Sequence, residues 1–214
     1  TTQVQKGLTT DEIVALTTVQ VSSLTTDQIQ SLTTDQVKAM ETRDVAALTT
    51  RQVAALTTTQ VQKGLTTDEI VALTTGQAAA LTTDQVIALT TDQVKAIETR
   101  DIAALTTADV AALTTTQVQK GLSTDQVAAL TTAGVASLTT DQISKGLTTD
   151  QVVALKTGQI QALNTDQVQS LTTDQVKAME TNDVAALTTR QVAALTTTQV
   201  QKGLTTDEIV ALTT

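Results

Sequence analysis

Apolar residues recur along the chain at every eighth position. Leu, replaced once by Met, stands at positions 8, 16, 24, 32, 40, 48 and 56, and the unit reads Leu-Thr-Thr-Asp-Gln-Val-x-Ala. This pattern lacks the strict alternation of a half-buried strand. A single long helix is also disfavoured, because eight residues advance about 800°, so the leucines would drift around the helix axis. The pattern therefore predicts many short helices, each turning into the next at the Leu-Thr step.

Each unit carries the signals of a helix start, as the octad from Leu147 shows. Thr148 followed by Gln151 matches a capping box, in which the Thr oxygen accepts the Gln backbone N–H and the Gln side chain accepts the Thr backbone N–H. Leu147 and Val152 occupy the positions of a hydrophobic staple. Asp150 falls in the first turn, where the helix dipole favours negative charge. We therefore predict a helix of about six residues in each octad.

Some units are one residue longer and end in Lys-Gly. Their glycines are separated by 57, 57, 25 and 57 residues, so a super-repeat overlies the octads. The lysine is predicted in the last turn, and the glycine at the position just after the helix, where a left-handed backbone is common. These glycines are Gly7, Gly64, Gly121, Gly146 and Gly203.

The array also carries a long duplication. Residues 31–75 and 170–214 are identical except that Arg43 in the first copy corresponds to Asn182 in the second. We therefore interpret residues 1–214 as one tandem-repeat array, grouped in 57-residue super-repeats, and as an excerpt of a longer array.

A single octad is too small to fold alone. Burying its Leu and Val yields about 1.5 to 3 kcal/mol each, whereas ordering eight residues costs about 1.5 kcal/mol per residue. The octads must therefore stack, with Leu and Val inside and Ala permitting close approach. We predict an all-α solenoid, a superhelix of very short stapled helices with one helix per octapeptide. A β-solenoid is the alternative, and three or four octads per turn are both considered.

Composition narrows the function classes. The chain has no Phe, Trp, Tyr, Pro, Cys or His, and its net charge is −9. Without His or Cys, catalytic triads, cysteine nucleophiles and the usual zinc sites are excluded. The negative charge disfavours nucleic acid and anionic membrane surfaces as partners, and no apolar run approaches the roughly 18 residues of a spanning helix. We expect no enzyme activity, catalytic residue, cofactor or metal centre, although weak calcium sites between turns stay open.

One octad type departs from the consensus and concentrates charge. In Met40–Asp44, Glu41 replaces the capping Thr and Asp44 replaces the Gln, and the same change recurs near residues 98 and 180. A solvated face with weak surface ion pairs is one interpretation. The sharper hypothesis is that these clusters set lateral register between neighbouring chains. The residues concerned are Lys38, Glu41, Arg43, Asp44, Lys95, Glu98, Arg100, Asp101, Lys177, Glu180 and Asp183.

The tandem phrase Leu-Thr-Thr-Asp-Gln-Val-x-Ala-Leu resembles the threonine-rich octapeptide arrays of very large bacterial exported proteins of the adhesin or exoprotein kind. That resemblance implies an extracellular or cell-surface location. We expect a structural protein, a self-stacking filament or rod-like spacer of a bacterial surface or biofilm matrix, whose partner is another copy of itself, head to tail. Lateral self-association is a further option. The alternatives are a solenoid binding module for a protein or glycan, and an ice-binding array of threonines.

Overall fold

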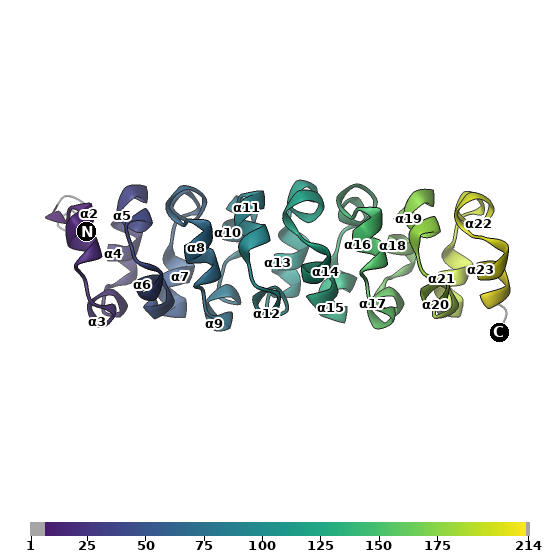
Figure 1. The fold of residues 1–214 in the computed structure, drawn as a ribbon, viewed down its shortest axis with the longest axis horizontal. Helices are drawn as coiled ribbons and strands as arrows, with labels where there is room; N and C mark the ends of the chain where they lie inside the picture. The colour runs from purple at the N-terminus through teal and green to yellow at the C-terminus, as the bar shows by residue number, and fades with distance from the viewer. Residues whose placement is uncertain (1–6, 213–214) are drawn as a thin grey trace. The chain divides into compact units, whose positions relative to one another are not determined.

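A computed structural model describes residues 7–212, and this range contains helices and no strands. The helices form two compact units, Thr1–Ala112 and Leu113–Thr214, and each is described by itself. Helices labelled α have the ordinary hydrogen-bond spacing, whereas those labelled η are π-helices (Figure 1). The predicted all-α class is therefore confirmed.

The helices of the first unit are α2 (Thr10–Val14), α3 (Thr18–Ser22), α4 (Thr26–Ser31), α5 (Thr34–Lys38), α6 (Thr42–Ala47), α7 (Thr50–Ala55), η1 (Gln60–Gly64), α8 (Thr67–Val71), α9 (Thr75–Ala78), α10 (Thr83–Ala88), α11 (Thr91–Ala96), α12 (Thr99–Ile102) and α13 (Thr107–Ala112). Those of the second unit are η2 (Gln117–Gly121), α14 (Thr124–Ala129), α15 (Thr132–Ser137), η3 (Gln142–Gly146), α16 (Thr149–Val153), α17 (Thr157–Ala162), α18 (Thr165–Ser170), α19 (Thr173–Ala178), α20 (Thr181–Ala185), α21 (Thr189–Ala194), α22 (Thr197–Gly203) and α23 (Thr206–Ala211).

Three octads make one turn of the superhelix within each unit, because every helix packs against the helix three places further along. In the first unit this gives three columns: α2, α5, η1, α10 and α13; α3, α6, α8 and α11; α4, α7, α9 and α12. In the second unit the columns are η2, η3, α18 and α21; α14, α16, α19 and α22; α15, α17, α20 and α23. Of the two numbers considered from the sequence, three is therefore correct.

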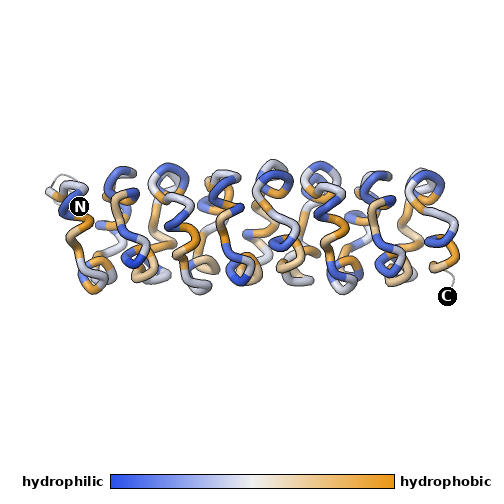
Figure 2. The backbone as a smooth tube through the Cα atoms, viewed as in Figure 1, coloured by the Kyte–Doolittle hydropathy of each residue, from blue (hydrophilic) through white to orange (hydrophobic). Residues whose placement is uncertain are grey.

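The core of each unit consists of the Leu and Val positions of the octads, as predicted. Val45 and Val168 are fully buried, and the neighbouring leucines, such as Leu48 and Leu171, are nearly so. Figure 2 shows the apolar segments recurring along the tube at each turn of the superhelix. Because the apolar side chains are small, each turn must gain stability from its neighbours, which is the behaviour of a repeat protein.

The predicted helix starts are also confirmed. In the octad from Leu147, Thr148 is the N-cap, its side chain accepts from the Gln151 backbone N–H, and the Gln151 side chain accepts from the Thr148 backbone N–H at 2.8 Å. Asp150 lies in the first turn. Leu147 and Val152, the expected staple residues, are both buried. The local sequence of an octad is therefore sufficient to start its helix.

The prediction for the Lys-Gly units is half wrong. Lys63 lies in the last turn as expected, but Gly64 is the final residue of the π-helix η1 rather than a left-handed residue after it. No described glycine has a positive φ. The extra residue is accommodated by widening one helical turn, and the same holds at Gly121 and Gly146. Gly203 ends α22, and Gly7 lies at the edge of the described residues.

The requirement for glycine in the Lys-Gly units comes from close packing and not from the backbone conformation. A Cβ atom added to Gly64 would lie 2.9 Å from Cβ and from Cγ1 of Val37, in the helix stacked beneath η1. Gly146 and Gly203 approach Val118 and Val176 in the same way. The wider π turn brings its backbone against a buried valine, and only a residue without a side chain fits there.

Candidate functional site: the contacts between turns and the charged clusters

Each turn is held to the turn before it by the glutamine of the capping box. Gln52 shows the arrangement: its Oε1 accepts from the Thr49 backbone N–H at 2.7 Å. Its Nε2 donates to the carbonyl oxygens of Val21 and Leu24, at 2.9 and 2.8 Å. Val21 lies at the end of α3 and Leu24 just before α4, so one amide joins three backbone groups. We call this set of contacts the glutamine clamp.

The glutamine clamp recurs in both units with constant geometry. Nε2 lies 2.6 to 2.8 Å from the carbonyl oxygen of the residue at the Leu position. Its bonds to the carbonyl oxygen at the Val position measure 2.7 to 3.1 Å. These carbonyls end a helix, where intrahelical partners run out. With one side chain, the clamp therefore satisfies a donor at the start of its own helix and carbonyl acceptors in the preceding turn. Its donors are Gln36, Gln52, Gln60, Gln77, Gln85, Gln93, Gln142, Gln151, Gln159, Gln167, Gln175, Gln191 and Gln199.

The two faces of a turn are therefore different and complementary. The glutamine amide points to the preceding turn, and the Val position is covered by the following turn. Exposure shows this polarity: Val168 is fully buried, whereas Val200 and Ile209, in the last described helices, are 36% and 43% exposed. Gln20, in the first described turn, is likewise exposed. Every turn thus offers donors on one face and carbonyls with apolar side chains on the other.

The first charged cluster combines one surface ion pair with one buried acid. The Arg43 guanidinium lies 2.6 Å from a Glu41 oxygen, and its Nε lies 4.0 Å from Asp44 Oδ1. Glu41 is the N-cap of α6 and makes no side-chain cap hydrogen bond. Asp44 is only 1% exposed, and neither of its carboxylate oxygens has a hydrogen-bond partner. Burial raises the pKa of Asp44, while Arg43 opposes this shift and Glu41 adds to it.

The buried aspartates of the two other clusters each accept a hydrogen bond from a threonine in the preceding turn. Thr75 donates its hydroxyl to Asp101 Oδ1 at 2.7 Å, and Thr157 donates to Asp183 Oδ1 at 2.8 Å. Arg100 pairs with Glu98 as Arg43 does with Glu41, whereas Asn182 carries no charge. The interpretation of these clusters as fully solvated faces is therefore wrong for Asp44, Asp101 and Asp183, which occupy the buried glutamine position.

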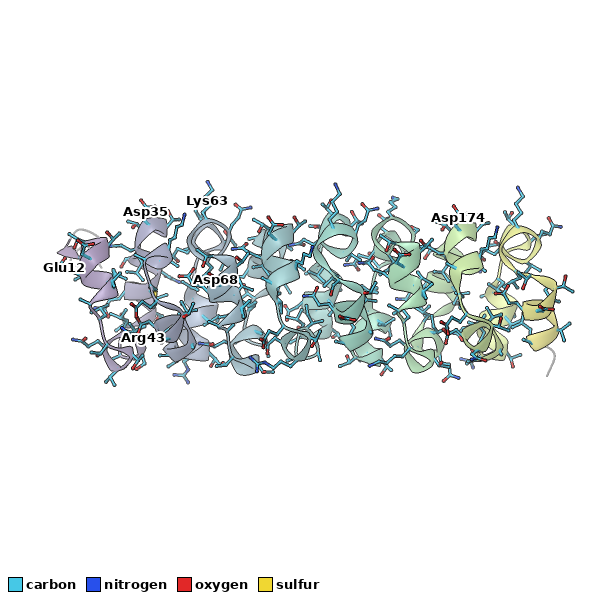
Figure 3. All side chains as sticks on the ribbon, viewed as in Figure 1. Glu12, Asp35, Arg43, Lys63, Asp68 and Asp174 are labelled. Atoms are coloured by element: carbon cyan, nitrogen blue, oxygen red, sulfur yellow. The ribbon has the colours of Figure 1, made fainter. Side chains whose placement is uncertain are left out.

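The lysines assigned to these clusters lie on the preceding helices. Lys38 ends α5, Lys95 lies in the last turn of α11, and Lys177 lies in the last turn of α19. Figure 3 shows Lys63 and Asp35 pointing away from the first unit, and Asp174 away from the second. Lys63, Asp35 and Asp174 therefore lie on the outside of their units.

The geometry restricts how the clusters could set lateral register. Within the first unit, α6 belongs to the column of α3, α8 and α11, whereas α12 belongs to the column of α4, α7 and α9. Because seven octads separate α6 from α12 and three octads make a turn, each super-repeat moves its cluster to another column. A neighbour lying along one column would therefore meet one of these two clusters. A role in lateral contacts remains a prediction.

A match to the repeat model of a protein family identifies the family of this chain. The model of the ALTTAQ repeat matches seven segments, which overlap from the second one on, at residues 6–34, 37–75, 65–96, 94–132, 127–157, 146–181 and 176–214. The chain belongs to the ALTTAQ repeat family. Several of these ALTTAQ repeats span about four octads, more than one turn of the superhelix. The comparison with curated proteins finds no match.

Among solved structures, the ALTTAQ array is similar to the leucine-rich repeat-containing protein LegL7 from Legionella pneumophila. The identity is 10%, the TM-score is 0.25, and the alignment covers 96% of this chain and 78% of that one. We infer nothing further from a likeness at this score. The solenoid arrangement of the ALTTAQ repeats rests on the stacking of the helices within each unit.

Three further observations concern candidate ligands of the ALTTAQ array. Among residues 7–212, no group of three or more acidic side chains is arranged to hold a metal ion. In the same range, no helix has the length and apolarity needed to cross a membrane. A shallow hollow in the second unit is lined by Gln161, Leu163, Asn164, Thr165, Thr188, Arg190 and Gln191.

Proposed function

We propose that this ALTTAQ array is a structural module, a self-stacking spacer or filament segment of an extracellular surface or matrix. The observation that supports this most is the complementarity of the two faces of each turn. Because the glutamine clamp uses the same backbone groups at every turn, an added turn needs no specialised sequence. A turn from a second copy of the chain would be held in the same way as the next turn of the same copy.

Association of copies through these faces would be head to tail. Gln20 would donate to helix-end carbonyls of the other copy, and the exposed Val200 and Ile209 would be covered as their equivalents are inside each unit. The two faces differ, so such a contact is heterologous and does not close on itself. A fibre is the expected product. The extracellular location rests on the resemblance to exported octapeptide arrays.

Sedimentation velocity over a range of concentrations, with electron microscopy, tests this proposal. We expect the sedimentation coefficient to rise with concentration and fibres to appear. Ile209→Lys should abolish this growth, because it places a charge on the stacking face. Val71→Lys is the matched control: Val71 is 42% exposed, close to the 43% of Ile209, but faces outward from α8. Wild-type chain that stays monomeric throughout would overturn self-stacking.

The solenoid binding module is the second candidate, favoured by the hollow beside Asn164 and Arg190. Near-identical octads offer little specificity, but this hollow combines residues that depart from the consensus. A monomeric wild type would give this candidate priority. Equal loss of assembly in Ile209→Lys and Val71→Lys would instead indicate side-by-side contacts.

A further inference from the structure

One octapeptide occurs three times with an acid at the clamp position. Thr-Thr-Asp-Glu-Ile-Val-Ala-Leu is found at residues 9–16, 66–73 and 205–212. Glu69, in the second copy, is only 2% exposed, whereas Glu12, in the first, is exposed. The two copies share every residue, so any difference between these carboxyl groups comes from the turn stacked against Glu69.

Half of the glutamine clamp is intact at Glu69. Its Oε2 accepts from the Thr66 backbone N–H at 2.5 Å, as a glutamine Oε1 would. Its other oxygen, Oε1, is buried and has no hydrogen-bond partner. That atom stands in place of the Nε2 amide, which in the flanking octads donates to two carbonyls. An acceptor has therefore replaced a donor.

The flanking octads identify the groups opposite Oε1. Gln60 donates to Ile29 and Leu32, and Gln77 donates to Val45 and Leu48. By the same register, the carbonyls of Val37 and Met40 belong to the octad of Glu69. A carboxylate facing two carbonyl oxygens is repelled by them, whereas a protonated carboxyl has an O–H to donate.

We propose that Glu69 is a proton-binding site at a contact between turns: once it takes up a proton, its O–H donates to the carbonyl oxygen of Val37 or Met40 and completes the clamp. Deprotonation removes that donor and loosens the contact of α8 with the end of α5 and the start of α6. The site makes this turn of the solenoid tighter in acid than at neutral pH.

Electrostatics agree with this geometry. Burial raises the pKa of Glu69, whereas in the identical octapeptide the hydrogen bonds from Thr9 lower the pKa of Glu12. At Glu69 the hydrogen bonds from Thr66 oppose the rise, Asp68 adds to it, and Lys38 opposes it. The charged groups on α8, on the helices packed against it and on the adjoining helices are Asp68, Asp35, Lys38, Glu41, Arg43, Asp44, Lys63, Asp92 and Lys95.

The sign of the linkage follows from the raised pKa. A carboxyl that binds a proton more tightly in the folded state contributes its full stability below the unfolded value of 4.5, and this contribution is lost as the pH rises through the folded pKa. Glu12 has a lowered pKa, so its contribution to stability is present at higher pH and is lost as the pH falls. Glu69→Gln supplies the missing donor at every pH, so it should remove the dependence.

Hydrogen exchange of the backbone amides in α8, compared between wild type and Glu69→Gln from pH 4 to 7.5, tests the proposal. We expect exchange near pH 7 to be roughly tenfold slower in the variant, the effect of one restored buried hydrogen bond, and the two proteins to converge near pH 4. Glu12→Gln is the matched control and should leave exchange in α8 unchanged. A wild-type-to-variant ratio that does not change with pH would overturn the proposal.

A measurement on the unmodified chain keeps the test independent of the variant's folding. Carboxyl carbon NMR of the wild type should show Glu69 titrating above 4.5 and Glu12 below it. If Glu69 titrates with or below Glu12, the buried proton does not exist and the proposal fails, whatever the fate of the self-stacking function.

Discussion

The neighbouring helices α6 and α7 carry different residues at the position that faces the preceding turn. In α7, Gln52 holds the backbone N–H of Thr49 and the carbonyls of Val21 and Leu24. In α6, Asp44 occupies the same buried position, but its carboxylate is one methylene shorter, cannot donate when ionised and has no hydrogen-bond partner. The fold tolerates the loss of one clamp because the clamps on either side remain.

This difference teaches that helix formation and turn stacking are separable in an octad. Helix α6 forms although its N-cap, Glu41, makes no side-chain cap hydrogen bond. What α6 lacks is the hydrogen bonds of the glutamine clamp, although it still packs against α3 in the preceding turn. Stability should therefore depend more on the amide at the clamp position than on the residue that caps the helix.

The largest expected effect comes from breaking a clamp. Gln52→Leu leaves the Thr49 backbone N–H and the Leu24 carbonyl without partners, whereas the Val21 carbonyl keeps its bond from the Leu24 backbone N–H. We therefore expect the free energy of unfolding to fall by about 3 kcal/mol. Urea unfolding measures the loss, and hydrogen exchange in α4 and α7 should locate it. Gln30→Leu, at an exposed position of α4, is the control. Equal losses in the two variants would mean that the clamp contributes nothing beyond its apolar contacts.

The sequence predicted what is local to one octad and missed what lies between turns. Thr148, Gln151 and Asp150 act within eight residues, so their roles could be predicted. The Nε2 contacts of Gln52 span 28 and 31 residues, and finding them requires knowing that three octads make a turn. The sequence of one octad does not contain that number. The same reason hid the burial of Asp44 and the packing of Gly64 against Val37.

The π-helix η1 is held by the glutamine clamp of Gln60 and also contacts the preceding turn through the bare backbone of Gly64. Gly64→Ala would place its Cβ 2.9 Å from Val37, in a buried contact that cannot yield, so we expect a loss of about 1 to 3 kcal/mol. Gly76→Ala is the matched control, because its Cβ would meet only Thr50 Cγ2, at 3.9 Å. There the better helix propensity of Ala should stabilise by roughly 0.5 to 1 kcal/mol. Thermal unfolding that shifts both variants in the same direction would contradict this assignment.

Repairing α6 should give an effect of intermediate size and opposite sign. Asp44→Gln restores an amide that can reach the carbonyls of Ile13 and Leu16, by the register of Gln52, so we expect a gain of about 1 to 2 kcal/mol at pH 7. Gln159 supports this, since it clamps Val127 and Leu130 although Lys156 is its N-cap residue. Urea unfolding measures the gain. Asp27→Gln, on the surface of α4, should change little; a destabilised Asp44→Gln would show that α6 has adapted to its carboxylate.

The smallest effect should come from the one position that distinguishes the duplicated segments. Arg43 is 64% exposed, so its attraction to Asp44 is screened, and Arg43→Asn should cost less than about 1 kcal/mol at pH 7. Burial already raises the pKa of Asp44, and losing Arg43 raises it further. The cost should therefore vanish below the unfolded value of 3.8, where Asp44 is protonated in both states.

The second copy offers the reciprocal experiment. Asn182→Arg restores the arginine beside Asp183, and urea unfolding at pH 7 should show a small gain in the free energy of unfolding. Asp183 already accepts from Thr157, a partner that Asp44 lacks, so the gain should be smaller than the loss in Arg43→Asn. An equal or larger gain would mean that the Thr157 hydroxyl does not stabilise the buried carboxylate of Asp183. The charge of the neighbouring residue alone would then decide how well an aspartate is tolerated at the clamp position.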